Sequence, residues 1–95
     1  MFVGALVLEL YMPQCRNLKD KRQVVKSIAA RTRQVFNVAV AEVGKNDLWQ
    51  AATLAVVCVS NSEHAAREIL AEVERSVMAT GKAEVIESPV FIFTP

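Results

Sequence analysis

The segment QAATLAVVCV (residues 50–59) decides the fold, because it is apolar on both of its faces. Strands that are buried on both faces read as nearly continuous apolar runs, whereas half-exposed strands alternate with polar residues. The sequence therefore predicts a central strand here. The preceding residues 44–47 (GKND) have the composition of a turn. That turn follows a second predicted strand at residues 38–43, in which Val38 and Val40 share one face.

A helix is predicted on the C-terminal side of the central strand. Ser60 and Glu63 have the spacing of a capping box, in which two side chains satisfy backbone N–H groups of the first helical turn. Gly81 is a natural C-terminal stop for this helix. Its apolar residues recur at helical spacing: Ala66, Ile69, Leu70, Val73 and Val77. Residues 82–93 supply the last strand, which Pro89 either confines to a sheet edge or divides in two.

The N-terminal part of the chain also reads as a strand followed by a helix. Residues 2–11 (FVGALVLELY) predict the first strand, which ends at Met12-Pro13. Asn17 is suited to cap the following helix, with Asp20 three positions later. The residues that form one stripe of this helix are Leu18, Val25, Ile28, Ala29, Thr32, Val35 and Phe36.

The predicted order of elements is therefore β-α-β-β-α-β. With right-handed crossovers, this order folds into an antiparallel sheet of strand order 4-1-3-2 with two helices on one face. The fold class is α+β, a ferredoxin-like split βαβ sandwich, and the two most apolar strands occupy its centre. A chain of 95 residues with 53% hydrophobic residues predicts a single domain spanning residues 1–95.

Charge is distributed unequally between the two predicted helices. Residues 16–33 contain seven basic residues and one acidic residue, whereas residues 61–80 contain four Glu and two Arg. Four cations fall within about 60° of one another on the first helix: Lys19, Arg22, Lys26 and Arg33. Such a ridge can follow a polyanion, and each neutralised phosphate adds salt-sensitive affinity. The alternative is an ordinary solvated face, whose long side chains cover apolar surface.

The predicted topology brings further residues to one end of the sheet. The first helix begins at the end where the hairpin between strands two and three turns and where the last strand begins. An aromatic residue beside cations is typical of sites that stack a base, although Trp49 is also suited to close the end of the core. The predicted RNA- or anion-binding residues are Arg16, Lys19, Lys21, Arg22, Lys26, Arg33, Lys45 and Trp49.

No catalytic or metal-binding signature is present, and we predict a non-enzymatic protein without cofactor or metal. His64 is predicted to be a solvated surface residue. Glu42 is predicted either to pair with a cation of the first helix or to be turned outward by a bulge. Cys58 is predicted to be a core thiol. Cys15 precedes a basic helix start, which favours a lowered pKa, but it has no paired base. The loop of residues 12–17 lacks the glycine with which acylphosphatases of this fold hold phosphate, so a small-substrate enzyme with an anion there ranks last.

The sheet face away from the helices suggests a different kind of partner. Its predicted residues are small and aliphatic: Val3, Ala5, Val7, Thr53, Ala55 and Val57. RNA-recognition motifs share this topology but read bases with aromatic residues on such a face. An exposed aliphatic face is better suited to packing against protein. The alternative function is therefore a homodimerisation or protein-interaction module.

The expected location is the cytoplasm, without a membrane partner. Cys15 and Cys58 are too few and too separated for a disulfide scaffold, which indicates reduced thiols. The N-terminal apolar run is interrupted by Glu9 and is shorter than the roughly 20 apolar residues that a spanning helix needs.

Five short motifs occur in order along the chain. They are NLKDKR (17–22), FNV (36–38), AEVG (41–44), DLWQ (47–50) and VSN (59–61). Together they resemble the YlxP-like family of small bacterial proteins, a domain of unknown function. The family typically has Ser where this chain has Asn17, a change that preserves capping. The resemblance implies a ferredoxin-like fold, and a gene often located among genes for transcription, translation-initiation and ribosome-maturation factors. It therefore implies RNA or ribosome association and assigns no catalytic residue.

Overall fold

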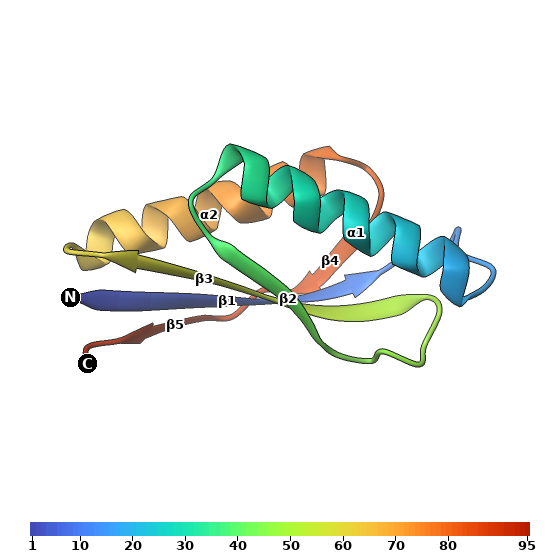
Figure 1. Cartoon of the computed structure of the whole chain (residues 1–95), viewed down its shortest axis with the longest axis horizontal. Helices are drawn as coiled ribbons and strands as arrows, with labels where there is room; N and C mark the ends of the chain where they lie inside the picture. The colour runs from blue at the N-terminus through green and yellow to red at the C-terminus, as the bar shows by residue number, and fades with distance from the viewer.

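Two α-helices lie on one face of a five-stranded antiparallel sheet (Figure 1), in a computed structural model that describes residues 1–95. The elements are β1 (Phe2–Tyr11), α1 (Leu18–Val35), β2 (Ala39–Gly44), β3 (Ala51–Ser60), α2 (Glu63–Ala79), β4 (Glu84–Glu87) and β5 (Val90–Phe93). Strands are ordered β2-β3-β1-β4, and β5 also pairs with β1. The predicted ferredoxin-like fold and its strand order are confirmed. No helix combines the length and the apolar character needed to cross a bilayer.

The core lies between the two central strands and the helices. Alternate residues of β1 and β3 face the helices, so that Leu8 lies opposite Leu54 and Leu6 lies opposite Val56. All four side chains are at most 1% exposed. Burying a side chain of this size stabilises the fold by about 1.5–3 kcal/mol. The helices complete the core with Val25, Ile28, Ala29, Ala66, Leu70, Val73 and Val77.

Pro89 divides the last strand into two parts. β4 pairs with the C-terminal half of β1 and β5 pairs with its N-terminal half, and a register shift separates Glu9 from Leu10 on β1. The carbonyl of Pro89 accepts a hydrogen bond from the N–H of Val7 at 3.0 Å. Proline has no N–H to donate, which is why the strand is interrupted at this residue.

The helix caps agree with the sequence at α1 and differ at α2. Asn17 accepts a hydrogen bond from the N–H of Asp20 at 2.8 Å, as predicted. At α2 the cap is Ser62, which accepts from the N–H of Ala65 at 3.2 Å. The prediction of Ser60 was wrong, because β3 continues to Ser60 through its pairing with Phe2.

Candidate nucleic-acid interface

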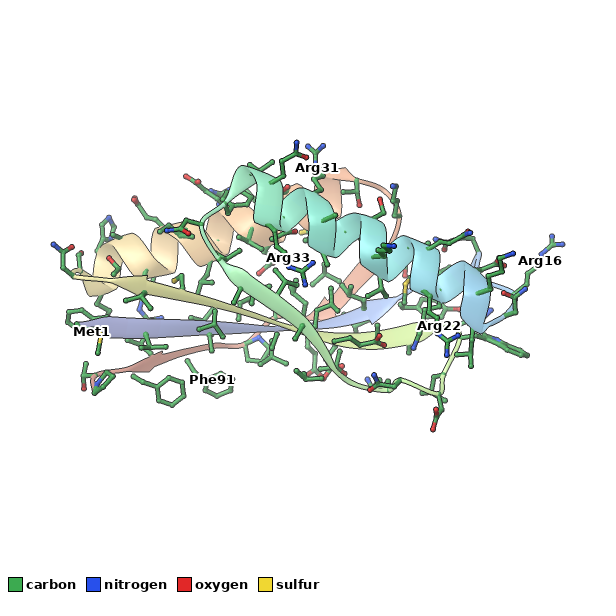
Figure 2. The ribbon with its side chains drawn as sticks, in the orientation of Figure 1. Met1, Arg16, Arg22, Arg31, Arg33 and Phe91 are labelled. Carbon is green, nitrogen blue, oxygen red and sulfur yellow. The ribbon has the colours of Figure 1, made fainter.

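The outer face of α1 carries a group of exposed cations that have no acidic partner. Lys19, Arg22 and Lys26 are exposed, and so is Arg16 just before the helix. The four ion pairs of the protein involve none of these residues. Figure 2 shows Arg16 beyond the N-terminal end of α1 and Arg22 beside the β2–β3 hairpin. We call Arg16, Lys19, Arg22 and Lys26 the α1 ridge.

Arg33 extends the α1 ridge only in part. Its guanidinium donates a hydrogen bond to the carbonyl of Val40 on β2 at 2.7 Å. A carbonyl does not neutralise the charge, but it holds the side chain against the edge of the sheet. Arg31 lies on the other side of the helix, pointing away from the sheet (Figure 2), and it is also without a carboxylate partner.

Lys21 does not lie on the α1 ridge, and its predicted contact with phosphate was wrong. Its side chain is 1% exposed, and its Nζ lies 3.0 Å from Oε2 of Glu42. The same ammonium donates to three backbone carbonyls, those of Lys45 (2.9 Å), Asn46 (3.2 Å) and Ala51 (3.3 Å). This arrangement, the Lys21 clamp, fixes the first turns of α1 to the β2–β3 hairpin. The prediction that Glu42 pairs with a cation of the first helix is confirmed.

Lys45 also has an acidic partner, which lies on the sheet face away from the helices. Its Nζ lies 2.9 Å from Oε1 of Glu9, and the hydroxyl of Thr53 donates to the same oxygen at 2.6 Å. The Thr53 hydrogen bond and the Lys45 ammonium lower the pKa of Glu9, so its carboxylate stays ionised. Lys45 adopts a left-handed backbone conformation with φ of 60°. The charge of Lys45 is therefore matched locally and does not extend the α1 ridge.

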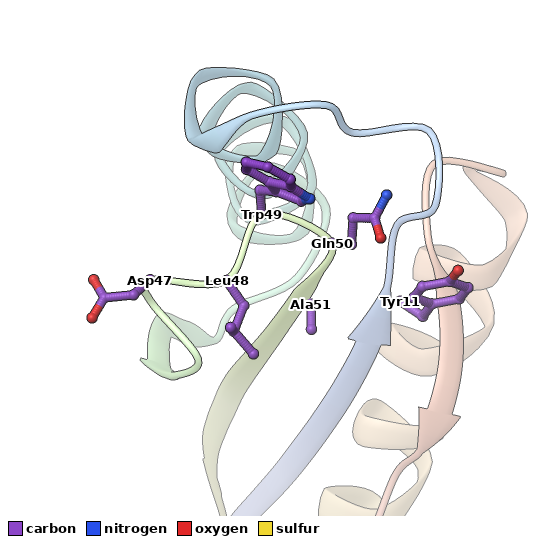
Figure 3. Close-up of a pocket in the computed structure, with 6 residues that line it drawn as sticks. All are labelled: Tyr11, Asp47, Leu48, Trp49, Gln50 and Ala51. Atoms are coloured by element: carbon purple, nitrogen blue, oxygen red, sulfur yellow. The ribbon is translucent and has the colours of Figure 1, made fainter.

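A cavity of about 430 Å³ opens at the end of the sheet beside the hairpin (Figure 3). Its lining residues are Tyr11, Asp47, Leu48, Trp49, Gln50 and Ala51. Trp49 is 52% exposed and therefore does not close the core. Sequence analysis found Trp49 and missed Tyr11, although the pairing of Tyr11 with Ala51 follows from the antiparallel alignment of the two central strands.

The two thiols are buried, and neither is an accessible nucleophile. Burial raises the pKa of Cys15, and the nearby Asp20 carboxylate adds to that effect. The expectation of a lowered pKa was therefore wrong, because Cys15 packs into the core beneath the loop and not at its surface. Burial also raises the pKa of Cys58, the predicted core thiol.

The remaining acidic and histidine side chains form no assembled centre. His64 is exposed and lies 3.1 Å from Oε1 of Glu68 on the same helix. No group of three or more His, Cys, Asp or Glu side chains lies close enough together to hold a metal ion.

The sheet face away from the helices, called the open face here, is apolar around the N-terminal half of β1. Val3 lies opposite Val59 and Phe93, and Ala5 lies opposite Val57 and Phe91. Figure 2 shows Phe91 on the side of the sheet away from the helices. Phe91, Phe93 and Val59 are 48%, 55% and 66% exposed. Sequence analysis had placed only small aliphatic residues on this face, and β5 adds two phenyl rings to them.

The helices on one face of a split βαβ sheet define the ferredoxin-like class, and two solved structures share this fold. One is a de novo designed protein with a ferredoxin fold, with a TM-score of 0.55 and 14% identity, covering 100% of this chain and 87% of the design. The other is At3g17210 from Arabidopsis thaliana, with a TM-score of 0.50 and 17% identity, covering 98% and 94% of the two chains. At these identities the likeness concerns the fold alone.

The chain belongs to the DUF503 family, whose description is "Protein of unknown function" and whose model matches residues 3–90. It is 32% identical over 88 residues to "Uncharacterized protein YlxP" of Bacillus subtilis (strain 168), covering 82% of this chain and 96% of that protein. The resemblance to the YlxP-like family is thus confirmed.

Proposed function

We propose that this protein is a non-enzymatic, cytoplasmic RNA-binding protein that associates with ribosomal RNA through the α1 ridge. The observation that supports this proposal is that Arg16, Lys19, Arg22 and Lys26 are exposed without any carboxylate partner. Cations that are free of protein partners can release counterions from phosphates, which is the main source of affinity for nucleic acid. Lys21 and Lys45 are not part of the proposed surface.

The location of the cations on α1 also supports a function. Lys19 and Arg22 lie near the N-terminus of the helix, where the helix dipole disfavours positive charge. Asp20 offsets this effect only in part, because its carboxylate accepts from the backbone N–H of Arg16 and contacts none of the ridge side chains. The placement of these cations is therefore not the one that favours the stability of the helix. The acidic α2 directs a polyanion to the α1 side of the helical layer.

The test compares a ridge variant with a control variant of equal charge. The ridge variant is Lys19→Gln, Arg22→Gln and Lys26→Gln. The control lowers the net charge by the same three units at exposed positions of α2, by removing two cations and adding one carboxylate: Arg67→Gln, Arg75→Gln and Ala71→Glu. Fragments of ribosomal RNA are bound at about 50 and about 200 mM salt in a fluorescence anisotropy titration. The ridge variant is expected to lose about tenfold or more in affinity, and the control much less.

The salt dependence provides a second readout of the same experiment. Each phosphate contact on a single strand contributes about −0.7 to the slope of log affinity against log salt, so the ridge variant should lose about 2 from that slope. Equal affinity and equal slope for the parent and the ridge variant would rule out this function.

The open face favours a second candidate function, association with a second copy of this chain. The molecule is elongated, measuring 42 × 21 × 19 Å, and each partner of a standard interface buries about 800 Å². Exposed phenyl rings at Phe91 and Phe93, beside the aliphatic residues of β1 and β3, are the kind of residue that interface centres use. Packed face to face, two sheets would form a four-layer dimer with α1 exposed on both sides.

Light scattering coupled to size exclusion tests the dimer. The parent protein is expected to elute as a dimer at concentrations near 100 µM, an ordinary range for weak homodimers, and Phe91→Glu is expected to elute as a monomer. Met78→Glu is the matched control, because Met78 is an exposed apolar residue of α2 away from the open face. A monomeric parent protein, or a dimer that survives Phe91→Glu, would refute this arrangement.

A further inference from the structure

The cavity beside the hairpin is lined by two accessible aromatic side chains. Trp49 lies immediately before β3 and Tyr11 ends β1, and both line the cavity. Figure 3 shows Trp49 beside the start of α1 and Tyr11 at the end of β1, with Gln50 between them in this view. Both aromatic residues are partly exposed, 52% for Trp49 and 40% for Tyr11. Aromatic side chains that are left accessible next to cations are the groups on which single-stranded nucleic acids stack their bases.

The polar groups of the cavity favour a ligand that donates hydrogen bonds. The Nε2 of Gln50 is already committed, because it donates to the carbonyls of Pro13 and Cys15 at 3.2 Å each. The amide of Gln50 is therefore held in one orientation, and Figure 3 shows its oxygen turned toward the side of Tyr11. That oxygen accepts no hydrogen bond from the protein, so it is free to accept from an N–H group of a base. Asp47 points away from the cavity (Figure 3).

The cavity is fixed beside the α1 ridge. The Lys21 ammonium binds the carbonyls of Asn46 and Ala51, which flank the cavity residues 47–50 in the chain. The next residue, Arg22, is exposed, and Figure 2 shows it on the hairpin side of α1. A phosphate held by Arg22 would thus lie on the side of α1 that faces the hairpin, and Trp49 belongs to the segment that connects the two strands of this hairpin.

We infer that this cavity accepts one unpaired nucleobase, so that the protein selects RNA that is single-stranded at this point. The inference rests on the proposed function, because the α1 ridge must hold the phosphates on either side of the base. A base inside a duplex is stacked and paired, and it cannot enter a cavity of this kind without leaving its helix. The duplex would therefore bind to the α1 ridge alone.

The experiment uses the single tryptophan of the chain as its probe. Intrinsic fluorescence and anisotropy are recorded during titration with an oligoadenylate single strand and with an RNA duplex of equal length. The single strand is expected to quench Trp49 and to bind Trp49→Ala about tenfold more weakly than the parent, as for the loss of one stacked base. Trp49→Phe, which keeps an aromatic ring, is expected to bind within about threefold of the parent. Duplex binding should be equal for the parent and Trp49→Ala.

Failure of the inference can be distinguished from failure of the proposed function. If Trp49→Ala binds the single strand as tightly as the parent, and no quenching occurs, the cavity does not hold a base. In that case the triple variant Lys19→Gln/Arg22→Gln/Lys26→Gln would still bind both RNAs more weakly than the parent if the α1 ridge binds phosphate. If this triple variant binds both RNAs normally, the proposed function itself is wrong.

Discussion

Replacing Lys21 with methionine is expected to lower the free energy of unfolding by about 3 kcal/mol, the lower end of the range for breaking a buried ion pair. The substitution keeps an unbranched apolar side chain but leaves Glu42 without its partner. It also removes the donor for three backbone carbonyls of the hairpin. The lower end applies because the Glu42 side chain is 19% exposed and remains in contact with water. Urea denaturation followed by circular dichroism measures the loss.

Two further variants isolate the Lys21 clamp from general effects of the substitution. Lys19→Met makes the same change at an exposed position of the same helix, and should alter stability by about 0.5 kcal/mol or less. Lys21→Met combined with Glu42→Gln removes the unpaired charge, and should be less destabilised than Lys21→Met alone. A loss below about 1 kcal/mol for Lys21→Met would show that the ammonium is not needed for the structure.

Replacing Gly4 with valine is expected to cost about 2–3 kcal/mol, as for an overpacked core. Gly4 lies on β1 beneath Ala66 and Leu70 of α2. A Cβ added at Gly4 would lie 3.0 Å from Cδ1 of Leu70, 3.2 Å from Sγ of Cys58 and 3.5 Å from Cβ of Ala66. Valine favours strands by itself, by up to about 1 kcal/mol, so a measured loss of stability reports the packing of α2.

Two further variants serve as controls for the thermal and urea unfolding of Gly4→Val. Ala5→Val adds the same kind of side chain to the next residue of β1, on the open face, and is expected to be neutral or slightly stabilising. Combining Gly4→Val with Leu70→Ala makes room for the new methyl groups. The double variant should therefore lose less unfolding free energy than the sum of the losses of the two single variants. A Gly4→Val protein as stable as the parent would mean that α2 shifts away without cost.

The fold could be predicted from the sequence because each element carries a clear pattern of its own. The apolar character of segments 2–11 and 50–59 identifies the two central strands. The pairing of these two strands determines where the other strands lie in the sheet. The burial of Lys21 was also visible in principle, since it precedes Val25 by four residues and Ile28 by seven, in phase with the buried stripe of α1. It was grouped with the other cations because charged residues are rarely buried.

The candidate site was less predictable, because its parts meet through strand pairing. The contact between Lys45 and Glu9 joins residues 36 positions apart. It depends on the register of β1, β2 and β3, which hydrophobic periodicity does not fix to one residue, and a shift in that register occurs between Glu42 and Gly44. Cys15 illustrates a second limit. The charges near it in sequence favour a lower pKa, but burial determines the direction, and burial is a property of the folded chain.

The break in the last strand has a consequence for how copies of this protein can associate. Long, flat strand edges allow chains to add to one another without limit. Here one edge is interrupted at Pro89 and carries Glu84 and Glu87, and the other edge is bent by the irregularity near Gly44. Growth of a fibre along either edge is therefore disfavoured, even though the neighbouring face is apolar. The proposed dimer through that face would be a closed two-fold pair, in which the two open faces cover each other and leave no such face for a third copy.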